Sequence, residues 1–490
     1  MVKYISSHQL SFTEFHTPFE KGIDGNNRWI RLTNQIPWDK LARIYVKSLR
    51  DNFGRPSVDP RIVIGAMIIK SKKALTDEET VEEIQENPYL QFFLGFKEFS
   101  HQPVFDPSLF VTLRKRMGTE VFEKMNQAFI SSIESSQQRK AQQANPKSKK
   151  CSSDCQNNTA EPNPLDSNDT SGKQAENQGK LIIDASVAPQ DIKYPTDLDL
   201  LDASREKAEQ IIDELYVPEP GKRKPRTYRK KARNDYLAMS FKKRKSKKEL
   251  RKSIRKQLNY VKRDIKIIHK LLDSNFQSLS IRSLRSFWII QEICRQQQEM
   301  YDKRSHKISD RIVSLSQPHV RPIVRGKAGK DVEFGAKLSV SLVKGFAYLD
   351  RISWDAYNES GDLIGQVENY RARHGFYPEV VLADKIYGTR ENRKYLTSKG
   401  IRFSGKSLGR PPKLSRKEKR RLQIEARLRS HIECKFGEGK RKYDLDLVKA
   451  KTMKTSESWI AAVFFVMNLA HWWRSDFLSS FSNEFSLGYQ

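Results

Sequence analysis

Three acidic residues stand out because of the elements that precede or carry them. Residues 181–183 (Leu-Ile-Ile) form a short apolar run that predicts a buried strand, and Asp184 follows at its tip. A second predicted buried strand, residues 379–383, is likewise followed directly by an acid, Asp384. The third acid, Glu433, lies on a predicted helix near the end of the chain. Singly, each acid has an ordinary interpretation as a turn residue, a helix cap or a partner in a surface ion pair.

Taken together, these carboxylates suit phosphodiester cleavage at two divalent metal ions. Mg²⁺ prefers hard oxygen ligands, and two ions roughly 3.5–4 Å apart share carboxylate oxygens. One ion activates the attacking water or 3′-hydroxyl, and the other stabilises the leaving oxygen. The chain has 90 Lys and Arg against 59 Asp and Glu, a net charge of +31. These cations would hold a polyanionic substrate that the acids alone would repel.

The composition favours nucleic acid as the partner and argues against a membrane protein. The chain has no uninterrupted apolar run of the length that spans a bilayer, about 18 residues, and charged residues interrupt its first 25 residues, so we expect no signal peptide. The four cysteines are too few and scattered for a disulfide scaffold, which predicts a reducing, cytoplasmic environment. Cys151 and Cys155 lack the further ligands of a zinc site.

The elements that must position the acids begin with a helical unit, residues 1–134. Asp59-Pro60 predicts a capped helix start, and Thr76 with Glu79 has the spacing of a capping box. A further helix, after Asp106-Pro107, ends in a basic cluster. The unit is either a DNA-binding module or a helical dimerisation unit with a solvated basic face. The cluster consists of Arg114, Lys115 and Arg116.

Two segments interrupt the chain after this unit. Residues 135–179 are polar and predict a disordered linker. Residues 198–325 are mostly helical, with predicted helices at 198–215 and 235–300, and form an insertion. Residues 221–256 contain 18 Lys and Arg but only two acids. This excess of cations favours contact with phosphates over the alternative of a helix surface exposed only to solvent. The densest cluster is Lys242, Lys243, Arg244 and Lys245.

The remaining residues, up to 475, predict a sheet followed by a long helix. Residues 338–342 alternate with period two, residues 346–354 form a second strand, and residues 358–362 have turn chemistry. Residues 401–403 predict another short strand. Ser415 with Glu418 has capping-box spacing and opens the helix that carries Glu433. Residues 476–490 are expected to be a C-terminal tail.

At these residues the chain resembles the DDE transposases of bacterial insertion sequences, within the retroviral-integrase and RNase H-like superfamily. Residues 181–189 look like the first acidic block of this family, and residues 383–388 (Ala-Asp-Lys-Ile-Tyr-Gly) look like the second. Residues 38–130 are similar to the N-terminal domain that precedes the catalytic domain. The third block is matched by the spacing of Arg429, Glu433 and Lys440.

The resemblance implies an α+β fold: an RNase H-like mixed sheet flanked by helices, interrupted by the basic insertion and preceded by an all-α DNA-binding domain. It implies a transposase that binds terminal inverted repeats on double-stranded DNA, hydrolyses the ends and joins the 3′-hydroxyls to target DNA. The enzyme would act as a dimer or higher oligomer in the cytoplasm, on the nucleoid. Asp184, Asp384 and Glu433 would bind two Mg²⁺ ions, with Mn²⁺ as a substitute. The implied phosphate neighbours are Lys385, Arg429 and Lys440.

The sequence also departs from the family pattern. Ala426 stands where related elements often have a tyrosine, and Gly437 and Gly439 are expected to fray the helix before Lys440. Glu438 is the rival of Glu433 for the third acid. Two alternatives stay open: a structure-specific nuclease that only hydrolyses DNA, and a catalytically silent DNA-binding protein derived from a transposase.

Overall fold

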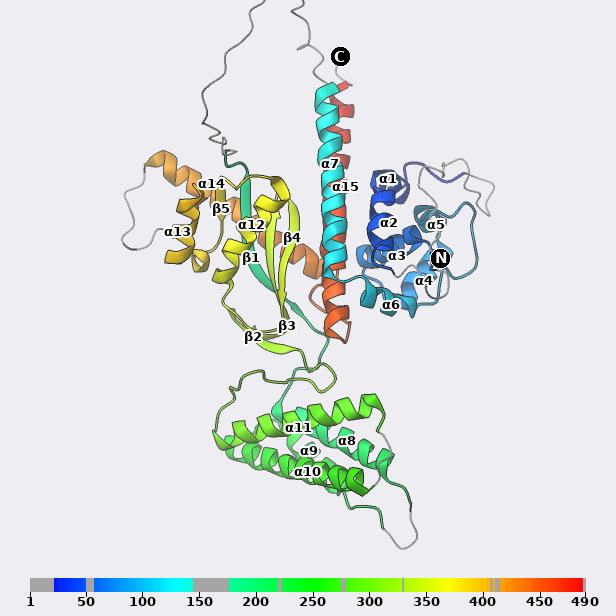
Figure 1. Cartoon of the computed structure of the whole chain (residues 1–490), viewed down its shortest axis with the longest axis vertical. Coiled ribbons are helices and arrows are strands. Elements are labelled where there is room, and N and C mark those ends of the chain that lie inside the picture. Colours follow the sequence, from blue (N-terminus) through cyan, green and yellow to red (C-terminus); the bar gives the residue numbers. More distant parts are fainter. Residues whose placement is uncertain are drawn as a thin grey trace, which may run out of the picture.

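The computed structural model describes residues 22–49, 57–143, 176–218, 223–274, 279–327, 330–405, 409 and 415–487. Most of the predicted linker, with Cys151 and Cys155, lies outside the described residues. Two long helices, α7 (Thr119–Gln143) and α15 (Met453–Leu487), lie side by side at the centre of the molecule (Figure 1). They separate the N-terminal helices from a sheet, and a group of four helices lies beyond one end of that sheet. Among the described residues, no helix has the length and apolar character needed to span a bilayer.

The N-terminal unit consists of short helices that begin where the capping signals predict. Asp59 accepts a hydrogen bond from the backbone N–H of Arg61 at the start of α3. Thr76 and Glu79 form the predicted capping box of α4. The helices are α1 (Arg28–Gln35), α2 (Trp38–Val46), α3 (Pro60–Lys73), α4 (Asp77–Glu86), α5 (Pro88–Leu94) and α6 (Leu109–Arg116).

The N-terminal helices share one hydrophobic core with the sheet. The same cluster of buried side chains contains Trp38 of α2 and Val340 of the sheet. Phe122 and Phe129 of α7 lie against Phe465 of α15, with ring centroids 6.3 and 6.4 Å apart. The predicted boundary at residue 134 falls inside α7, and α15 continues to Leu487 through residues predicted to be a tail. Both helices therefore join units that the sequence predicts as separate.

A six-stranded mixed sheet forms the second unit. Its strand order is β2-β3-β1-β5-β6, and β4 pairs with β3 beside β2. β1 is antiparallel to β3 and parallel to β5, which is parallel to β6. The strands are β1 (Lys180–Pro189), β2 (Arg321–Lys327), β3 (Lys330–Val343), β4 (Phe346–Ser353), β5 (Val380–Leu382) and β6 (Arg402–Phe403).

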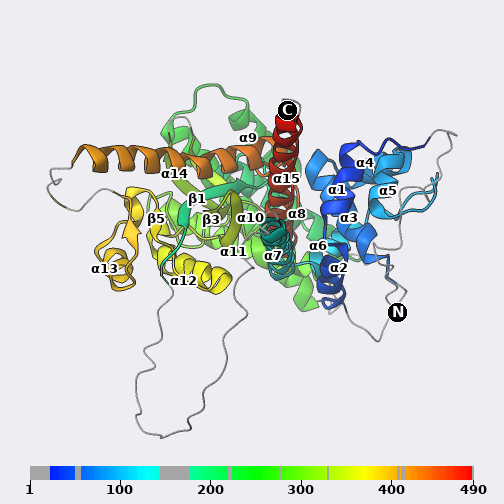
Figure 2. The same cartoon turned by 90° about the horizontal axis from the view of Figure 1, so that it is seen from above.

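Helices cover both faces of this sheet. Seen from above, α14 (Arg416–Lys442) runs along one side of the strands and α12 (Leu363–His374) along the other (Figure 2). α13 (Arg390–Ser398) precedes β6, and two 3-10 turns, η4 (Glu359–Asp362) and η5 (Lys385–Tyr387), lie near the ends of β4 and β5. The capping box of Ser415 and Glu418 opens α14 as predicted. Neither α12 nor β2 was predicted.

The insertion is a four-helix bundle between β1 and β2. It consists of α8 (Asp197–Leu215), α9 (Arg229–Ser240), α10 (Lys247–Ser274) and α11 (Ile281–Asp302). Its own core joins Leu201 and Ile212 of α8 to Val261 of α10 and Ile290 of α11. The helical stretch predicted over residues 235–300 is divided among three helices, because the chain turns between α9 and α10 and again before α11.

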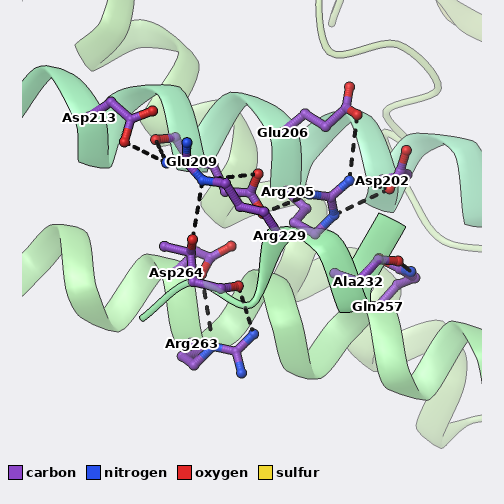
Figure 3. A network of polar contacts seen from close by, with 11 residues as sticks. Asp202, Arg205, Glu206, Glu209, Asp213, Arg229, Ala232, Gln257, Arg263 and Asp264 are labelled. Atoms are coloured by element: carbon purple, nitrogen blue, oxygen red, sulfur yellow. Dashed lines mark hydrogen bonds and ion pairs between the residues drawn. The ribbon is translucent and has the colours of Figure 1, made fainter. Parts of the chain in front are cut away.

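A network of charged side chains lies inside this bundle (Figure 3). The Arg205 side chain is 1% exposed and binds Asp202 and Glu209 through Nη2 and Nη1, each at 2.6 Å. Arg229 of α9 donates to the carbonyl of Glu209 at 3.0 Å and pairs with Asp213. These contacts fasten α9 to α8, although only Ala232 and Met239 of α9 are buried.

Candidate active site

Asp184 and Asp384 lie at the same level on neighbouring parallel strands. Ile182 of β1 pairs with Leu382 of β5. Asp184 and Asp384 each follow two residues later, so their side chains project from the same face of the sheet. Asp384 keeps an extended backbone (φ −70°, ψ 162°) after the end of β5, as predicted, and caps η5. Its Oδ1 accepts a hydrogen bond from the backbone N–H of Lys385 at 2.7 Å.

The prediction that Asp184 lies at the tip of a strand is wrong. β1 continues to Pro189, so Asp184 lies in the middle of the strand, paired in register with Val340 of β3. The residues after Asp184 are small and stay in the sheet because β3 covers their open edge. Gly335 permits this close pairing, since an added Cβ there would lie 2.0 Å from the carbonyl oxygen of Ala188.

Glu433 lies on α14, which packs across β1 and β5. Its side chain is 55% exposed, and its Oε1 is 3.2 Å from Nη1 of Arg429, one helical turn earlier. The predicted fraying of α14 at Gly437 and Gly439 does not occur, because the helix continues to Lys442. A Cβ at Gly439 would lie 3.0 Å from Leu445, so the glycine lets α14 approach its neighbours closely.

Glu438 differs from Glu433 in its surroundings. Its side chain is 13% exposed and forms ion pairs with Arg474 at 2.6 Å and Lys435 at 3.4 Å. Although burial raises the pKa of Glu438, Lys435 and Arg474 together hold it below the usual value. Glu438 is therefore a neutralised acid that ties α14 to α15, whereas Glu433 faces solvent.

Asp184 is partly buried, and both acidic and basic side chains act on its carboxyl. The pKa of Asp184 is raised to about 6, above all by burial and in smaller part by the charges of Glu359 and Glu433. A hydrogen bond from the Ala185 N–H, at 2.9 Å, and the charge of Arg429 oppose this shift. A carboxylate that is costly to ionise in this way gains from a nearby cation.

Glu359 is a further acid near Asp184 that was not predicted as a site residue. Among the charged groups around Asp184, it has the largest effect on the pKa of that carboxyl, ahead of Arg429 and Glu433. The segment that contains it, residues 358–362, was predicted only as a turn, and η4 forms there in the structure. An acid shortly after a strand of the sheet is the kind of signal that identified Asp384, and Glu359 follows β4 in this way.

The predicted acids are not assembled into a closed metal cage. Within the described ranges, no three His, Cys, Asp or Glu side chains are gathered closely enough to hold a metal ion. The two aspartates nevertheless share one face of the sheet, and the charge of Glu433 acts on Asp184. The arrangement is an open group of hard oxygen donors that needs further ligands to enclose an ion.

The predicted phosphate contacts differ in their surroundings. Lys385 is exposed beside Asp384, and Lys440 of α14 is 4.0 Å from Glu333 of β3. Lys115 and Arg116 are exposed at the end of α6. In the bundle, the predicted cluster is exposed in the turn between α9 and α10, where one lysine is paired with Glu249. That cluster is Lys242, Lys243, Arg244 and Lys245, and the paired lysine is Lys242.

Arg114 does not suit the predicted role of a DNA contact. Its side chain is 11% exposed, and its two terminal nitrogens bind the two oxygens of Asp77 at 2.8 and 2.6 Å. Its guanidinium also lies over Trp459 of α15, 5.8 Å from the ring centroid. We therefore correct the prediction: Arg114 joins α6 to α4 and α15, because its hydrogen-bonding fork is already filled.

Comparisons with known proteins agree with this arrangement. Residues 381–470, which include Asp384 and Glu433, match the family described as Transposase DDE domain. Residues 17–116 match the family described as Transposase domain (DUF772). The chain is 30% identical over 175 residues to the Rhizobium meliloti protein named "Uncharacterized protein ORF8 in nfe locus", covering 36% of this chain and 68% of that protein. No solved structure shows significant similarity to the chain. With its acidic blocks in order along the sheet and α14, the chain belongs to the DDE transposases of insertion sequences.

Proposed function

We propose that this transposase binds the inverted repeats at the ends of its element, cleaves them by metal-dependent hydrolysis and joins the 3′-hydroxyls to target DNA. One observation carries the proposal. Asp184 and Asp384 stand level on neighbouring strands under the helix that bears Glu433, and Asp184 has no ion-pair partner among the described residues. Such an open group of acids suits a shared ion site better than a structural salt bridge.

Asp184, Asp384 and Glu433 would hold two Mg²⁺ ions, for which Mn²⁺ can substitute. The donor set fits, because all three offer hard oxygens and Asp184 lies in a negative potential inside a strongly basic chain. Mg²⁺ commonly binds through one or two carboxylates together with substrate phosphates, which accounts for the open arrangement. When bound, the ions would supply Lewis acidity for in-line phosphoryl transfer.

The chain's own residues have defined tasks in this proposal. Arg429 holds the Glu433 carboxylate through their ion pair, and the 55% exposed Glu433 side chain stays accessible to an ion. Lys385, next to Asp384, and Lys440, further along α14, contact flanking phosphates. Since Asp184 must be ionised to act, its raised pKa predicts that activity declines as the pH falls towards 6.

The fold class of the catalytic unit is proposed to be RNase H-like. The strand order β4-β3-β1-β5-β6, antiparallel on one side of β1 and parallel on the other, supports this assignment. We propose three functional divisions: an N-terminal unit that binds DNA through Lys115 and Arg116, the catalytic sheet, and the bundle. The exposed cations of the bundle would contact the DNA backbone without sequence preference. The enzyme would act as a dimer or higher oligomer on nucleoid DNA in the cytoplasm.

The test uses two glutamates five residues apart on the same helix. Purified wild type and the variants Glu433→Gln and Glu438→Gln are incubated with a plasmid that carries the element's ends, in Mg²⁺ or in EDTA. We expect nicking and strand transfer by wild type and by Glu438→Gln in Mg²⁺, and neither reaction by Glu433→Gln or in EDTA. Band-shift assays check that all three proteins bind the ends.

Each other outcome has a stated meaning. A dead Glu438→Gln with an active Glu433→Gln would move the third ligand to Glu438. Mg²⁺-dependent cleavage without joining would favour the structure-specific nuclease. End binding without any cleavage would favour the silent DNA-binding protein.

A further inference from the structure

The first part of α14 is an exposed basic arm at the edge of the sheet. Glu425 fastens the helix to this edge, because its buried side chain binds Arg402 of β6, the last strand in the sheet order, at 2.5 and 3.0 Å. Figure 2 shows the beginning of α14 reaching beyond the strands, and Figure 1 also places it on the side of the sheet away from the N-terminal helices. We call residues 416–424 the α14 arm.

The cations of the α14 arm are not neutralised by the chain itself. All five are exposed, and none forms an ion pair with another described residue. The one acid of the arm, Glu418, is used in the capping box, where it accepts from the N–H and the hydroxyl of Ser415 at 2.8 and 2.9 Å. On α11, by contrast, Arg295 and Lys303 are paired with acids of the same helix. The cations of the arm are Arg416, Lys417, Lys419, Arg420 and Arg421.

One side of the arm is in line with Glu433 of the candidate active site. Lys419 lies two heptads before Glu433 on the same helix, so their side chains leave α14 only about 40° apart. Arg416 leaves the helix about 100° from Glu433 in the same rotational sense. Ala426, one heptad before Glu433, is exposed and small, which leaves room for a ligand along this line. A polyanion bound at Glu433 can therefore continue along this side of α14.

The arm and the N-terminal unit lie on opposite sides of Glu433. Beyond Glu433, α14 reaches α15, and α15 packs against α6, whose end carries the exposed Lys115 and Arg116. In the other direction, Lys419 and Arg416 lie about 21 and 26 Å from Glu433 along the helix. A duplex rises about 3.4 Å per base pair, so the arm reaches phosphates roughly six to eight base pairs from a phosphate held at Glu433.

We propose that Arg416 and Lys419 bind the backbone of the flanking duplex, the DNA outside the element, roughly six to eight base pairs beyond the scissile phosphate. The N-terminal unit holds the element's end on one side of the cut, so the DNA that leaves Glu433 on the opposite side is the flanking duplex. Phosphate contacts carry no sequence information, which suits a duplex whose sequence changes with each insertion. This inference rests on the proposed function, because it names the DNA that the same active site holds beyond the cut.

The competing interpretations are that the arm is a solvated surface, or that its charge attracts DNA without a fixed contact. The arm itself offers a matched test, because one arginine and one lysine lie on each side of it. Lys417 and Arg421 leave α14 on the other side, about 160° and 120° from Glu433 in the opposite sense. Replacing either pair with glutamine removes two charges and keeps a good helix former at both positions.

The experiment measures binding of the full-length chain to two duplexes in EDTA, by fluorescence anisotropy at several salt concentrations. Both duplexes carry the element's end, but one stops at the terminus and the other continues into flanking DNA for longer than the reach of the arm. The double variant Arg416→Gln/Lys419→Gln should lower the slope of log K against log salt by up to about 1.8 units on the longer duplex, since each phosphate contact contributes about 0.9. Its slope on the shorter duplex should equal that of wild type. Lys417→Gln/Arg421→Gln is the control and should bind both duplexes like wild type.

Three results would overturn the inference. Wild-type slopes in Arg416→Gln/Lys419→Gln would make the arm a solvated surface, and equal losses in the two double variants would make it a diffuse charge. An equal loss on both duplexes would place the arm on DNA of the element itself. Plasmid nicking by wild type in Mg²⁺ separates this inference from the proposed function. If wild type nicks at the element's ends and any of these three results is found, only the role of the arm fails. If wild type neither binds the ends nor nicks, the proposed function fails and this inference fails with it.

Discussion

Two groups of acids, one on the sheet and one in the bundle, show opposite ways of accommodating negative charge. In the bundle, Arg205 lies between Asp202 and Glu209 and binds both, so the acids are neutralised within the core (Figure 3). On the sheet, Asp184 and Asp384 have no ion-pair partner among the described residues, and burial, with a smaller contribution from neighbouring acids, raises the pKa of Asp184.

The difference separates structural acids from acids available to a ligand. Asp384 is exposed to water, whereas Asp184 is partly buried, and a carboxylate shielded from water without an internal partner gains from a cation or takes up a proton. Glu438 and Glu433 differ in a similar way on one helix: Glu438 is 13% exposed and has two cationic partners, whereas Glu433 is 55% exposed and has one, Arg429. The number of acids is therefore a weaker guide to the proposed site than the extent to which each acid is neutralised.

The largest expected effect is the loss of catalysis on removing one open acid. Asp184→Asn should lower the rate of Mg²⁺-dependent cleavage by about 10³-fold or more, because it removes charge from the metal ligands. DNA binding should stay near wild type in band-shift assays. Asp202→Asn, in the bundle, is the control and should cleave at close to the wild-type rate. Loss of cleavage in both variants would show that the two groups of acids do not differ in this way.

The next largest effect should be on stability. Arg205→Met leaves Asp202 buried without its cation and Glu209 with only its longer contact to Arg229 at 3.6 Å, which should lower the free energy of unfolding by about 3–5 kcal/mol. Hydrogen exchange should place the loss in the bundle. The control is Arg295→Met on α11, because Arg295 is 58% exposed and pairs with Glu292 and Glu299 on the surface. That variant should cost at most about 1 kcal/mol, and equal losses would contradict the comparison.

Asp264 is the exception within the bundle and gives a pH-dependent test. It is fully buried without a hydrogen-bond partner among the described residues. Burial and then Glu209 of α8 raise its pKa to about 7, against the charges of Arg263, Arg205 and Arg229. Since the folded state binds this proton more tightly than the unfolded state, the stability from Asp264 is present in acid and is lost as the pH rises from about 4 to 7.

Asp264→Asn should abolish that dependence. Its free energy of unfolding, compared with wild type in urea titrations, should rise between pH 4 and 7 by on the order of 2–4 kcal/mol and then stay level. A constant difference between the two proteins across this range would show that Asp264 is ionised in the fold and has a partner there.

The smallest effect concerns the exposed cations of the bundle. Replacing all four residues 242–245 with alanine should reduce the slope of log K against log salt by about 3 units, because each phosphate contact contributes about 0.9 and Lys242 is already paired with Glu249. Cognate and random duplexes should be affected equally, and the cleavage rate at saturating DNA should not change. The control is Lys303→Ala, since Lys303 is paired with Glu299 on α11. An unchanged slope would make the cluster a solvated surface.

Local signals in the sequence predicted much of this architecture. The caps at Asp59, at Thr76 with Glu79 and at Ser415 with Glu418 all form as predicted, because capping depends only on residues a few positions apart. Strand β5 and the place of Asp384 are also confirmed. The turn between α9 and α10 was missed because residues 241–246 contain no glycine or proline and are as polar as the helices around them.

The properties that the sequence did not predict depend on distant residues. β1 continues past Asp184 because β3, far along the chain, covers its edge. Arg114 is largely buried because it binds Asp77 and packs over Trp459. Glu359 is held by Lys337 of β3, and the next residue, Ser360, by Asn392 of α13, which belong to other elements. Spacing along the chain does not encode such contacts, so the predicted roles of single cations and acids needed the fold.

The position of the bundle also has a consequence for how the chain folds during synthesis. Pro189 of β1 pairs with Gly335 of β3, and Gly335 pairs with Arg321 of β2, so the two ends of the inserted segment flank one strand. Adjacent strands are about 4.8 Å apart, which places these ends about 10 Å from each other. β1 leaves the ribosome long before its partner β3. Because the bundle has its own core, it can fold in that interval and replace a long flexible loop by a short, fixed gap, which lowers the entropy lost when β1 and β3 pair.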